Sequence, residues 1–331
     1  MLREVLVADP RVEVVGFARD GADALERIAE LRPDVVTLDL LMPWSTGSTC
    51  CKPARARALR FVVVSTLDAP KRARRSRAWR GAIDFIHKPT SLATDRLYEL
   101  GGELVSKVLA AARASVRSPG VGAVGRASPS TRDGTPPEII VVGASTGGPR
   151  AVRALITALP GDLAAPVAIV LHMPSGYVET FADRLRERST LSVGISRSGQ
   201  ALEPGMAVLA VAGAHLLVAR RDGFAVARQA TEPAGLHVPS VDQLFESAAA
   251  AFGARALGVV LTGMGDDGVL GARALRAAGG TVWTESAETA VIFGMPRAVR
   301  DAGASDAELP LGAIADALTA VTGRARREAL P

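Results

Sequence analysis

A glycine-rich string at residues 143–148, Gly-Ala-Ser-Thr-Gly-Gly, has residue types suited to catalysis. It follows an apolar run and precedes a segment with helical periodicity, so we expect Ser145 at the tip of a strand-to-helix turn. The next backbone N–H groups would lie at the positive end of that helix. Three roles fit: a nucleophilic serine of the G-x-S-x-G type, an anion-binding loop, or a tight turn without chemistry. The string lacks the lysine of a P-loop and the spacing of G-x-G-x-x-G, which argues against both motifs.

A nucleophilic serine needs a base and a carboxylate that orients the base. His172 directly follows another apolar run, so it is expected at the same sheet edge as Ser145. The string 263–268, Gly-Met-Gly-Asp-Asp-Gly, follows a third apolar run and precedes a further helix. The alternatives are a histidine that only packs and acidic residues that only favour a helix N-terminus. Serine, histidine and aspartate at three strand ends of one sheet together favour a catalytic triad.

The elements that must position these residues follow from the apolar pattern. In the C-terminal part we expect strands at Glu138–Val142, Val167–Leu171, Gly258–Leu261 and Thr281–Thr284, helices at Pro149–Leu159, Leu244–Phe252 and Gly268–Ala278, a last helical section from Pro296, and a short antiparallel excursion at Ala207–Ala210 and Leu216–Ala219. In the N-terminal part we expect a helix at Ala22–Leu31 and strands at Val12–Gly16, Asp34–Leu38, Phe61–Ser65 and Ala82–Ile86. Strands that alternate with helices predict parallel sheets, and the C-terminal pattern predicts a doubly wound α/β domain.

Length and composition predict a two-domain globular protein. The chain has 331 residues, of which 48% are hydrophobic and 22% charged. Residues 115–137 are rich in Ser, Gly, Pro and Arg and predict a flexible linker between domains at 1–114 and 138–331. The sequence has neither a signal peptide nor an apolar run near the ~18–20 residues that span a bilayer, so a cytoplasmic location without membrane insertion is expected. The two cysteines are adjacent, at Cys50 and Cys51, which is not a metal-ligand spacing.

The net charge of +5 raises the question of nucleic-acid binding. Residues 71–80 alone hold six of the basic side chains, nearly all arginine. Aromatic residues make up only 4% of the chain, so a platform on which bases could stack is absent. We interpret the basic stretch as a solvated helix face, with a nucleic-acid patch as the weaker alternative.

Residues 138–318 resemble the catalytic domain of the chemotaxis protein-glutamate methylesterases. The strings that carry the resemblance are IIVVGASTGGPRA, VLHMPSGYVETFADRL, SVDQLFESAA, GVVLTGMGDDG and FGMPRAV, which occur in this order along the domain. The resemblance implies a triad of Ser145, His172 and Asp267, with Asp267 selected over Asp266 because it directly precedes the glycine of the GMG-x-D-G string. It also implies that the oxyanion is bound by backbone amides around Thr146 and Met264.

The N-terminal part resembles the response-regulator receiver domain, an incomplete version of this flavodoxin-like fold. The resemblance implies Asp39 as phospho-acceptor and Thr66 and Lys88 as switch residues, with Mg²⁺ needed only if the receiver is phosphorylated. Two departures are visible. Only about eleven residues precede the strand expected at Val12–Gly16, too few for the first receiver strand, its acidic Mg²⁺-binding pair and a helix. Residues 44–60 also lack the expected amphipathic helix.

The resemblance implies a serine hydrolase that removes γ-methyl esters from glutamates of methyl-accepting chemotaxis receptors, with methanol as product and deamidation of receptor glutamines as a second activity. Hydrolysis would need no cofactor. The expected partners are the cytoplasmic helices of membrane chemoreceptors and a chemotaxis histidine kinase as phosphodonor, but not nucleic acid. The alternative from another class is a catalytically silent, phospho-regulated receptor-binding protein. A DNA-binding response regulator is a third, but no helix-turn-helix pattern supports it.

The missing acidic pair leads to a prediction about regulation. Phosphoryl transfer to Asp39 needs Mg²⁺ between the carboxylate and the phosphoryl oxygens. Asp9 is followed directly by Pro10 and Arg11, which leaves no room for the helix that should intervene before the next strand. Acetyl phosphate with Mg²⁺ is therefore expected to leave the esterase rate of this chain nearly unchanged. A large activation that disappears in Asp39→Asn would contradict this prediction.

Overall fold

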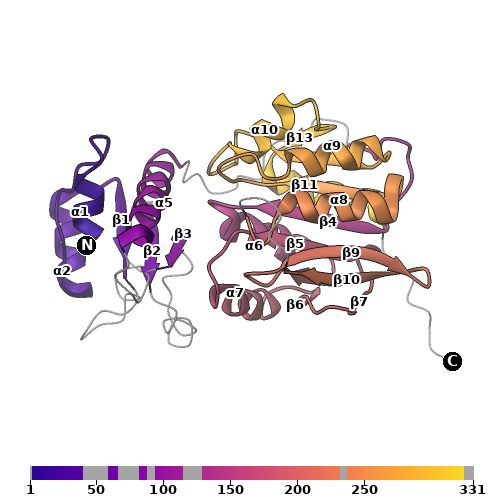
Figure 1. The fold of residues 1–331 in the computed structure, drawn as a ribbon, viewed down its shortest axis with the longest axis horizontal. Helices are drawn as coiled ribbons and strands as arrows, with labels where there is room; N and C mark the ends of the chain where they lie inside the picture. The colour runs from indigo at the N-terminus through magenta and orange to yellow at the C-terminus, as the bar shows by residue number, and fades with distance from the viewer. Residues whose placement is uncertain are drawn as a thin grey trace. The chain divides into compact units, whose positions relative to one another are not determined.

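The computed structural model describes residues 2–39, 59–65, 82–87, 94–114, 129–231 and 237–323. The chain divides into two compact units, Met1–Val116 and Arg117–Pro331. Each unit combines helices with a parallel sheet (Figure 1), which confirms the predicted α/β class. No helix in the described ranges is long and apolar enough to cross a membrane.

Unit 1 contains a three-stranded parallel sheet in the order β1-β2-β3. Its elements are α1 (Leu2–Val7), α2 (Gly21–Leu31), β1 (Val35–Leu38), β2 (Arg60–Ser65), β3 (Ala82–His87) and α5 (Thr94–Arg113). The α2 helix begins where the Asp20 carboxylate accepts hydrogen bonds from the N–H groups of Ala22 and Asp23. The predicted helix and the three later strands of this unit are thus confirmed.

The strand predicted at Val12–Gly16 is wrong, because residues 12–18 form no regular element. A strand needs a neighbour whose backbone groups pair with its own, and no described strand pairs with this segment. Val15 and Phe17 are accordingly 46% and 62% exposed. Among the described residues of unit 1, no strand precedes β1, and the expected first receiver strand is absent from this part.

Unit 2 is built on a seven-stranded parallel sheet in the order β13-β12-β11-β4-β5-β8-β6. Its strands are β4 (Ile139–Ala144), β5 (Val167–Leu171), β6 (Ser192–Ile195), β8 (Met206–Leu209), β11 (Ala256–Val260), β12 (Thr281–Glu285) and β13 (Ala307–Leu309). The helices are α6 (Gly148–Ala158), α7 (Tyr177–Arg186), α8 (Val241–Phe252), α9 (Val269–Ala277), α10 (Met295–Asp301) and α11 (Leu311–Thr322), with a short 3₁₀ turn at Gly253–Arg255.

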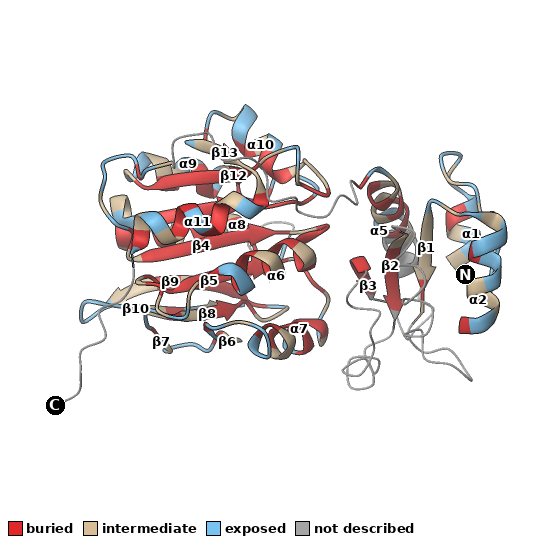
Figure 2. Ribbon diagram, turned by 180° about the vertical axis from the view of Figure 1, so that it is seen from behind, coloured by how far each residue is buried: buried red, intermediate tan, exposed pale blue. Residues whose placement is uncertain are grey.

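Helices cover both faces of this sheet. The α6, α7 and α11 helices lie on one face, and α8, α9 and α10 lie on the other (Figures 1 and 2). The central strands β4, β5 and β11 are buried along their whole length, as expected for parallel strands with helices on both sides (Figure 2). The predicted doubly wound architecture of unit 2 is therefore confirmed.

A second, antiparallel sheet in unit 2 has the order β7-β10-β9, with β7 at Ala201–Leu202, β9 at His215–Arg221 and β10 at Phe224–Ala230. The prediction that Ala207–Ala210 joins this excursion is wrong. Those residues belong to β8, which pairs with β5 and β6 in the main parallel sheet. Residues 207–209 are buried, and that continuous burial is typical of a strand inside a parallel sheet rather than of a half-exposed hairpin.

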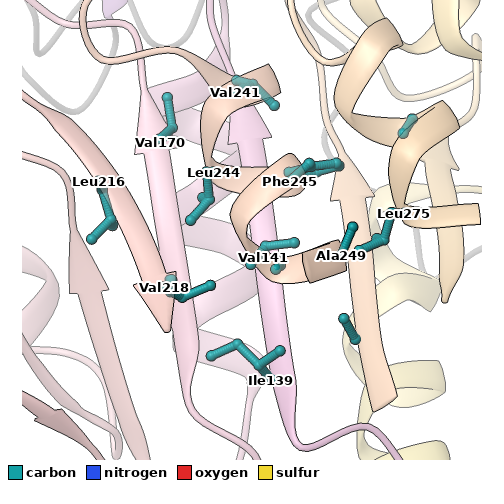
Figure 3. Close-up of a cluster of buried hydrophobic side chains, with 14 of the residues drawn as sticks. Ile139, Val141, Val170, Leu216, Val218, Val241, Leu244, Phe245, Ala249 and Leu275 are labelled. Atoms are coloured by element: carbon teal, nitrogen blue, oxygen red, sulfur yellow. The ribbon is translucent and has the colours of Figure 1, made fainter. Parts of the chain in front are cut away.

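A cluster of buried apolar side chains fills the space between α8 and the main sheet (Figure 3). Phe245 on α8 is fully buried and lies against β11 and α9. Glycine is required on the neighbouring helix, because a Cβ atom at Gly271 would lie 2.6 Å from the Cβ atom of Phe245. Because α9 packs closely against α8, the turn between β11 and α9 is held in place beside the start of α8.

The end of the segment predicted as a flexible linker is packed against unit 2. Thr131 is buried, and the Arg132 N–H donates to the Thr281 hydroxyl. The Arg132 guanidinium also donates to the Arg276 carbonyl. Since these contacts fix the backbone, residues 129–137 are better assigned to unit 2 than to a flexible linker, and residues 115–128 lie outside the described ranges.

Candidate active site

Ser145 and His172 follow adjacent parallel strands at the same edge of the main sheet. In the register of β4 and β5, Ala144 lies opposite Leu171, and the next residue on each strand is Ser145 or His172. The His172 N–H donates to the Ala144 carbonyl at 3.0 Å, which holds the two strand ends together. The connection after β4 leads towards β5, whereas the connection after β11 leads to β12, so the edge between β4 and β11 is a topological switch point. In doubly wound sheets, ligands bind in the crevice that forms at this point, outside the carboxyl ends of the strands.

Asp267 lies in the turn between β11 and α9 and contacts His172. The distance between His172 Nε2 and Asp267 Oδ2 is 2.9 Å. A carboxylate can only accept this hydrogen bond, so the proton is assigned to Nε2 and the Nδ1 atom of the neutral ring is left as an acceptor. Nδ1 is therefore the atom with which His172 could take a proton from a nucleophile.

The surroundings of Asp267 keep its carboxylate ionised although it is only 8% exposed. It receives hydrogen bonds from the Ser240 hydroxyl at 2.9 Å and from the N–H groups of Val241 and Asp242 at 2.8 and 3.0 Å. These groups form the N-terminus of α8, whose positive dipole end favours an anion. Burial would raise the pKa of Asp267, but the hydrogen bonds from His172 and from the α8 amides lower it to about 2.

Two backbone amides near Ser145 are fixed by the carbonyls of the same peptide units. The Ser145 carbonyl accepts the Gly148 N–H at 2.7 Å, and the Gly263 carbonyl accepts the N–H groups of Gly294 and Met295 at 3.1 and 2.8 Å. Because a trans peptide directs its N–H opposite to its carbonyl, these bonds also fix the directions of the N–H groups of the following residues, Thr146 and Met264. Among the hydrogen bonds of the described residues, none has Thr146 N–H or Met264 N–H as its donor.

The turn that carries Met264 lies directly against the turn that carries Ser145. A Cβ atom at Gly263 would be 3.0 Å from the Cβ atom of Ser145 and would overlap the Met295 sulfur. Gly147 is equally confined, since its φ is +81° and a Cβ atom there would be 2.5 Å from that of Val291. Glycine at these positions allows two turns from separate strands to meet at one point. The arrangement can bind an oxyanion beside a nucleophile.

Several residues of this site were not predicted as site residues, although the string that begins at Ser240 is one of those that carry the family resemblance. Ser240 and Asp242 come from the N-terminus of α8, and the Asp242 carboxylate accepts the N–H groups of Gly268 and Gly271 at the start of α9. Burial raises the pKa of Asp242 to about 6. The His237 ring stacks on that of His172, with 4.4 Å between centroids. Burial and the nearby His172 lower the pKa of His237.

The predicted residues of the receiver site are only partly within the described ranges. Asp39 follows β1 directly, at the carboxyl end of the parallel sheet of unit 1, where the sequence pattern placed it. Thr66 and Lys88 lie outside the described residues, as does the basic stretch 71–80. No group of three or more His, Cys, Asp or Glu side chains among the described residues could hold a metal ion.

Comparisons with known proteins cover both units. A family model described as "CheB methylesterase" matches residues 140–318, and one described as "Response regulator receiver domain" matches residues 1–99. A "Protein-glutamate methylesterase/protein-glutamine glutaminase 5" of Myxococcus xanthus is 48% identical over 94% of this chain and 91% of its own length. A protein-glutamate methylesterase/protein-glutamine glutaminase of Geobacillus kaustophilus is 41% identical over 97% of this chain and 95% of its own length.

Unit 2 is also similar to a solved structure. The crystal structure of the Thermotoga maritima CheB methylesterase catalytic domain matches with a TM-score of 0.54 and 36% sequence identity. The match covers 55% of this chain and 97% of that chain. The likeness therefore extends over essentially the whole of the Thermotoga domain.

The geometry at Asp267 predicts that its two adjacent aspartates differ in importance. Asp267→Asn places an amide where the ionised carboxylate accepts hydrogen bonds and favours the wrong tautomer of His172, so we expect the rate of ester hydrolysis to fall by about three to four orders of magnitude. Asp266 is exposed, and Asp266→Asn should change the rate by less than about twofold. A large loss of kcat in Asp266→Asn together with a small one in Asp267→Asn would show that the carboxylate has been assigned to the wrong residue.

Proposed function

The chain belongs to the CheB methylesterase family, and on this basis we propose that it is a serine hydrolase that removes γ-methyl esters from glutamate side chains of chemotaxis receptors. The observation that carries the proposal is the convergence of Ser145, His172 and an ionised Asp267 at one edge of the sheet of unit 2. The names of the full-length relatives support the same substrate chemistry.

In the proposed reaction, His172 takes the hydroxyl proton of Ser145 through Nδ1 while the serine oxygen attacks the ester carbonyl carbon. Asp267 holds the ring in this orientation and stabilises the imidazolium that forms. The negative charge that develops on the carbonyl oxygen is bound by the N–H groups of Thr146 and Met264. Removing one donor of this kind costs about 3–4 kcal/mol of transition-state stabilisation in other serine hydrolases.

The leaving methoxy group takes the proton from His172 and departs as methanol, which leaves an acyl-enzyme on Ser145. Water then attacks the acyl carbon while His172 accepts one of its protons. The bond to the Ser145 oxygen breaks, that oxygen takes the proton back from His172, and the glutamate side chain is released as a carboxylic acid that ionises in solution. A glutamine side chain would give the same acyl-enzyme with ammonia as the leaving group. We therefore include deamidation of receptor glutamines as a second activity of the same site.

The partners and the location follow from this function and are part of the proposal. The substrates are the cytoplasmic helices of membrane chemoreceptors, so the enzyme acts in the cytoplasm. Hydrolysis proceeds with the groups of unit 2 and needs no cofactor. A chemotaxis histidine kinase is the partner that would phosphorylate Asp39, and Mg²⁺ would be needed for that step alone, which the lack of the usual acidic pair in the sequence disfavours. The alternative of a catalytically silent binding protein has no support from the relatives. They are named as enzymes, and they are similar to this chain over nearly its full length.

Methanol release from methylated receptor membranes tests the proposed function. Ser145→Ala removes the nucleophile without adding atoms to a tightly packed turn, so the variant should fold and lose several orders of magnitude in rate. The full chain and this variant should be compared at equal concentration, with circular dichroism as the check on folding. A folded variant that keeps more than about a tenth of the rate would exclude Ser145 as the nucleophile.

A further inference from the structure

Thr262, the second residue after β11, connects two parts of the nucleophile turn. Its carbonyl accepts the Ser145 N–H at 3.0 Å, and its hydroxyl donates to the Thr146 carbonyl at 2.9 Å. The same hydroxyl accepts the Ile292 N–H at 2.9 Å. Thr262 is 1% exposed, so water does not compete for these bonds. It therefore fixes the backbone on both sides of the peptide that carries the Thr146 N–H.

Glu285, at the end of β12, holds Thr262 in turn. Its Oε2 atom accepts the Thr262 N–H at 2.8 Å, and its Oε1 atom accepts the Thr289 hydroxyl at 2.9 Å. Thr289 is itself held by the Leu311 N–H at 2.9 Å. The Glu285 side chain is completely buried, and the hydrolysis described above does not use it. Burying a carboxyl group costs free energy of folding unless hydrogen bonds or opposite charges compensate it, so a buried carboxyl group outside the triad calls for a functional explanation.

We propose that Glu285 is a positioning residue for the hydrolysis, whose carboxylate holds Thr262 so that Thr262 keeps Ser145 and the Thr146 N–H in the orientation that the oxyanion needs. Glu285 acts only through Thr262 and does not touch the substrate. The inference rests on the proposed function, since it deepens the account of the same site. It assigns a role to a fully buried carboxyl group that is hydrogen-bonded to the residue holding the nucleophile turn.

The charge on Glu285 matters, because a hydrogen bond to an ionised acceptor is roughly twice as strong as one to a neutral acceptor. Burial raises the pKa of Glu285 to about 7, against the lowering effect of the bonds from Thr262 and Thr289 and of the positive charge of Arg150. Thr262 lies in the turn after β11, Thr289 in the loop after β12, and Arg150 in α6. Of these three residues, only Arg150 carries a charge. As the pH falls through about 7, Glu285 takes up a proton and becomes a weaker acceptor for the Thr262 N–H.

Glu285→Gln tests the proposal, because the amide keeps the size and one acceptor oxygen but stays neutral at every pH. In the full chain at pH 8.5, we expect kcat for methanol release to fall about fivefold with KM unchanged within about twofold, since the loss concerns the transition state. At pH 6 the wild-type carboxyl is itself mostly protonated, so the two rates should approach one another. The ratio of the two rates isolates Glu285, because all other titratable groups are the same in the two proteins.

Matched variants separate positioning from general damage. Glu288→Gln makes the same charge change at an exposed site in the same loop and should leave the rate at its wild-type value. Thr262→Val, which removes the hydroxyl, should lower kcat by about tenfold or more, and Thr262→Ser should recover most of that loss.

A wild-type to Glu285→Gln rate ratio that stays constant from pH 6 to 8.5, whether it equals one or exceeds one, would overturn the proposal. A constant excess would mean that Glu285 is only structural. The rate at which a serine-directed phosphonate labels Ser145 should be measured in parallel, because it reports the same turn without a receptor. If the labelling ratio changes with pH as expected but the wild type releases no methanol, the proposed function fails and the role of Glu285 stands.

Discussion

The burial of one ionised carboxylate determines how the candidate active site is built. Asp267 remains charged at 8% exposure because His172 and the N-terminus of α8, with two backbone N–H groups and the Ser240 hydroxyl, donate hydrogen bonds to it. That requirement fixes α8 relative to the turn between β11 and α9. It also leaves one oxygen of the carboxylate in contact with the Nε2 atom of His172. The position and tautomer of the candidate base therefore follow from the way a buried charge is compensated.

The hydrogen bonds of the backbone also explain the oxyanion-binding geometry. A peptide has one donor and one acceptor that point in opposite directions, so a carbonyl that is fixed also fixes an N–H. The carbonyls of Ser145 and Gly263 accept hydrogen bonds from neighbouring N–H groups. The N–H groups of the following residues, Thr146 and Met264, are then oriented to bind an anion. The turns can meet because glycine at position 263 avoids an overlap with Ser145 and Met295. Preorganised donors of this kind need no rearrangement during the reaction.

The sequence predicts the residues that stand at strand ends better than those that hold them. Ser145, His172 and Asp39 each follow a strand directly, so the period of the apolar runs was sufficient to place them. Ser240 and Thr262 act through contacts with residues 27 and 116 positions away, and no local pattern encodes such partners. The pairing of strands is likewise non-local, so the apolar runs alone do not show which strands become neighbours. The run at 207–209 joins β5 rather than the following hairpin, and the run at 12–16 has no described partner.

Three buried or half-buried carboxyl groups at this edge of the sheet differ in charge state because they differ in donors. Asp267 has four hydrogen bonds, three of them from the N-terminal residues of α8, and its pKa falls to about 2. Glu285 has two, from one amide and one hydroxyl, and burial dominates, so its pKa rises to about 7. Asp242 also has two, beside the charge of Asp267, and its pKa rises to about 6. Only Asp267 is thus a permanent anion near neutral pH, which is what an imidazolium partner requires. Asp242 and Glu285 therefore change charge near neutral pH, so the hydrogen bonds that they accept from the turns weaken as the pH falls, whereas those accepted by Asp267 do not.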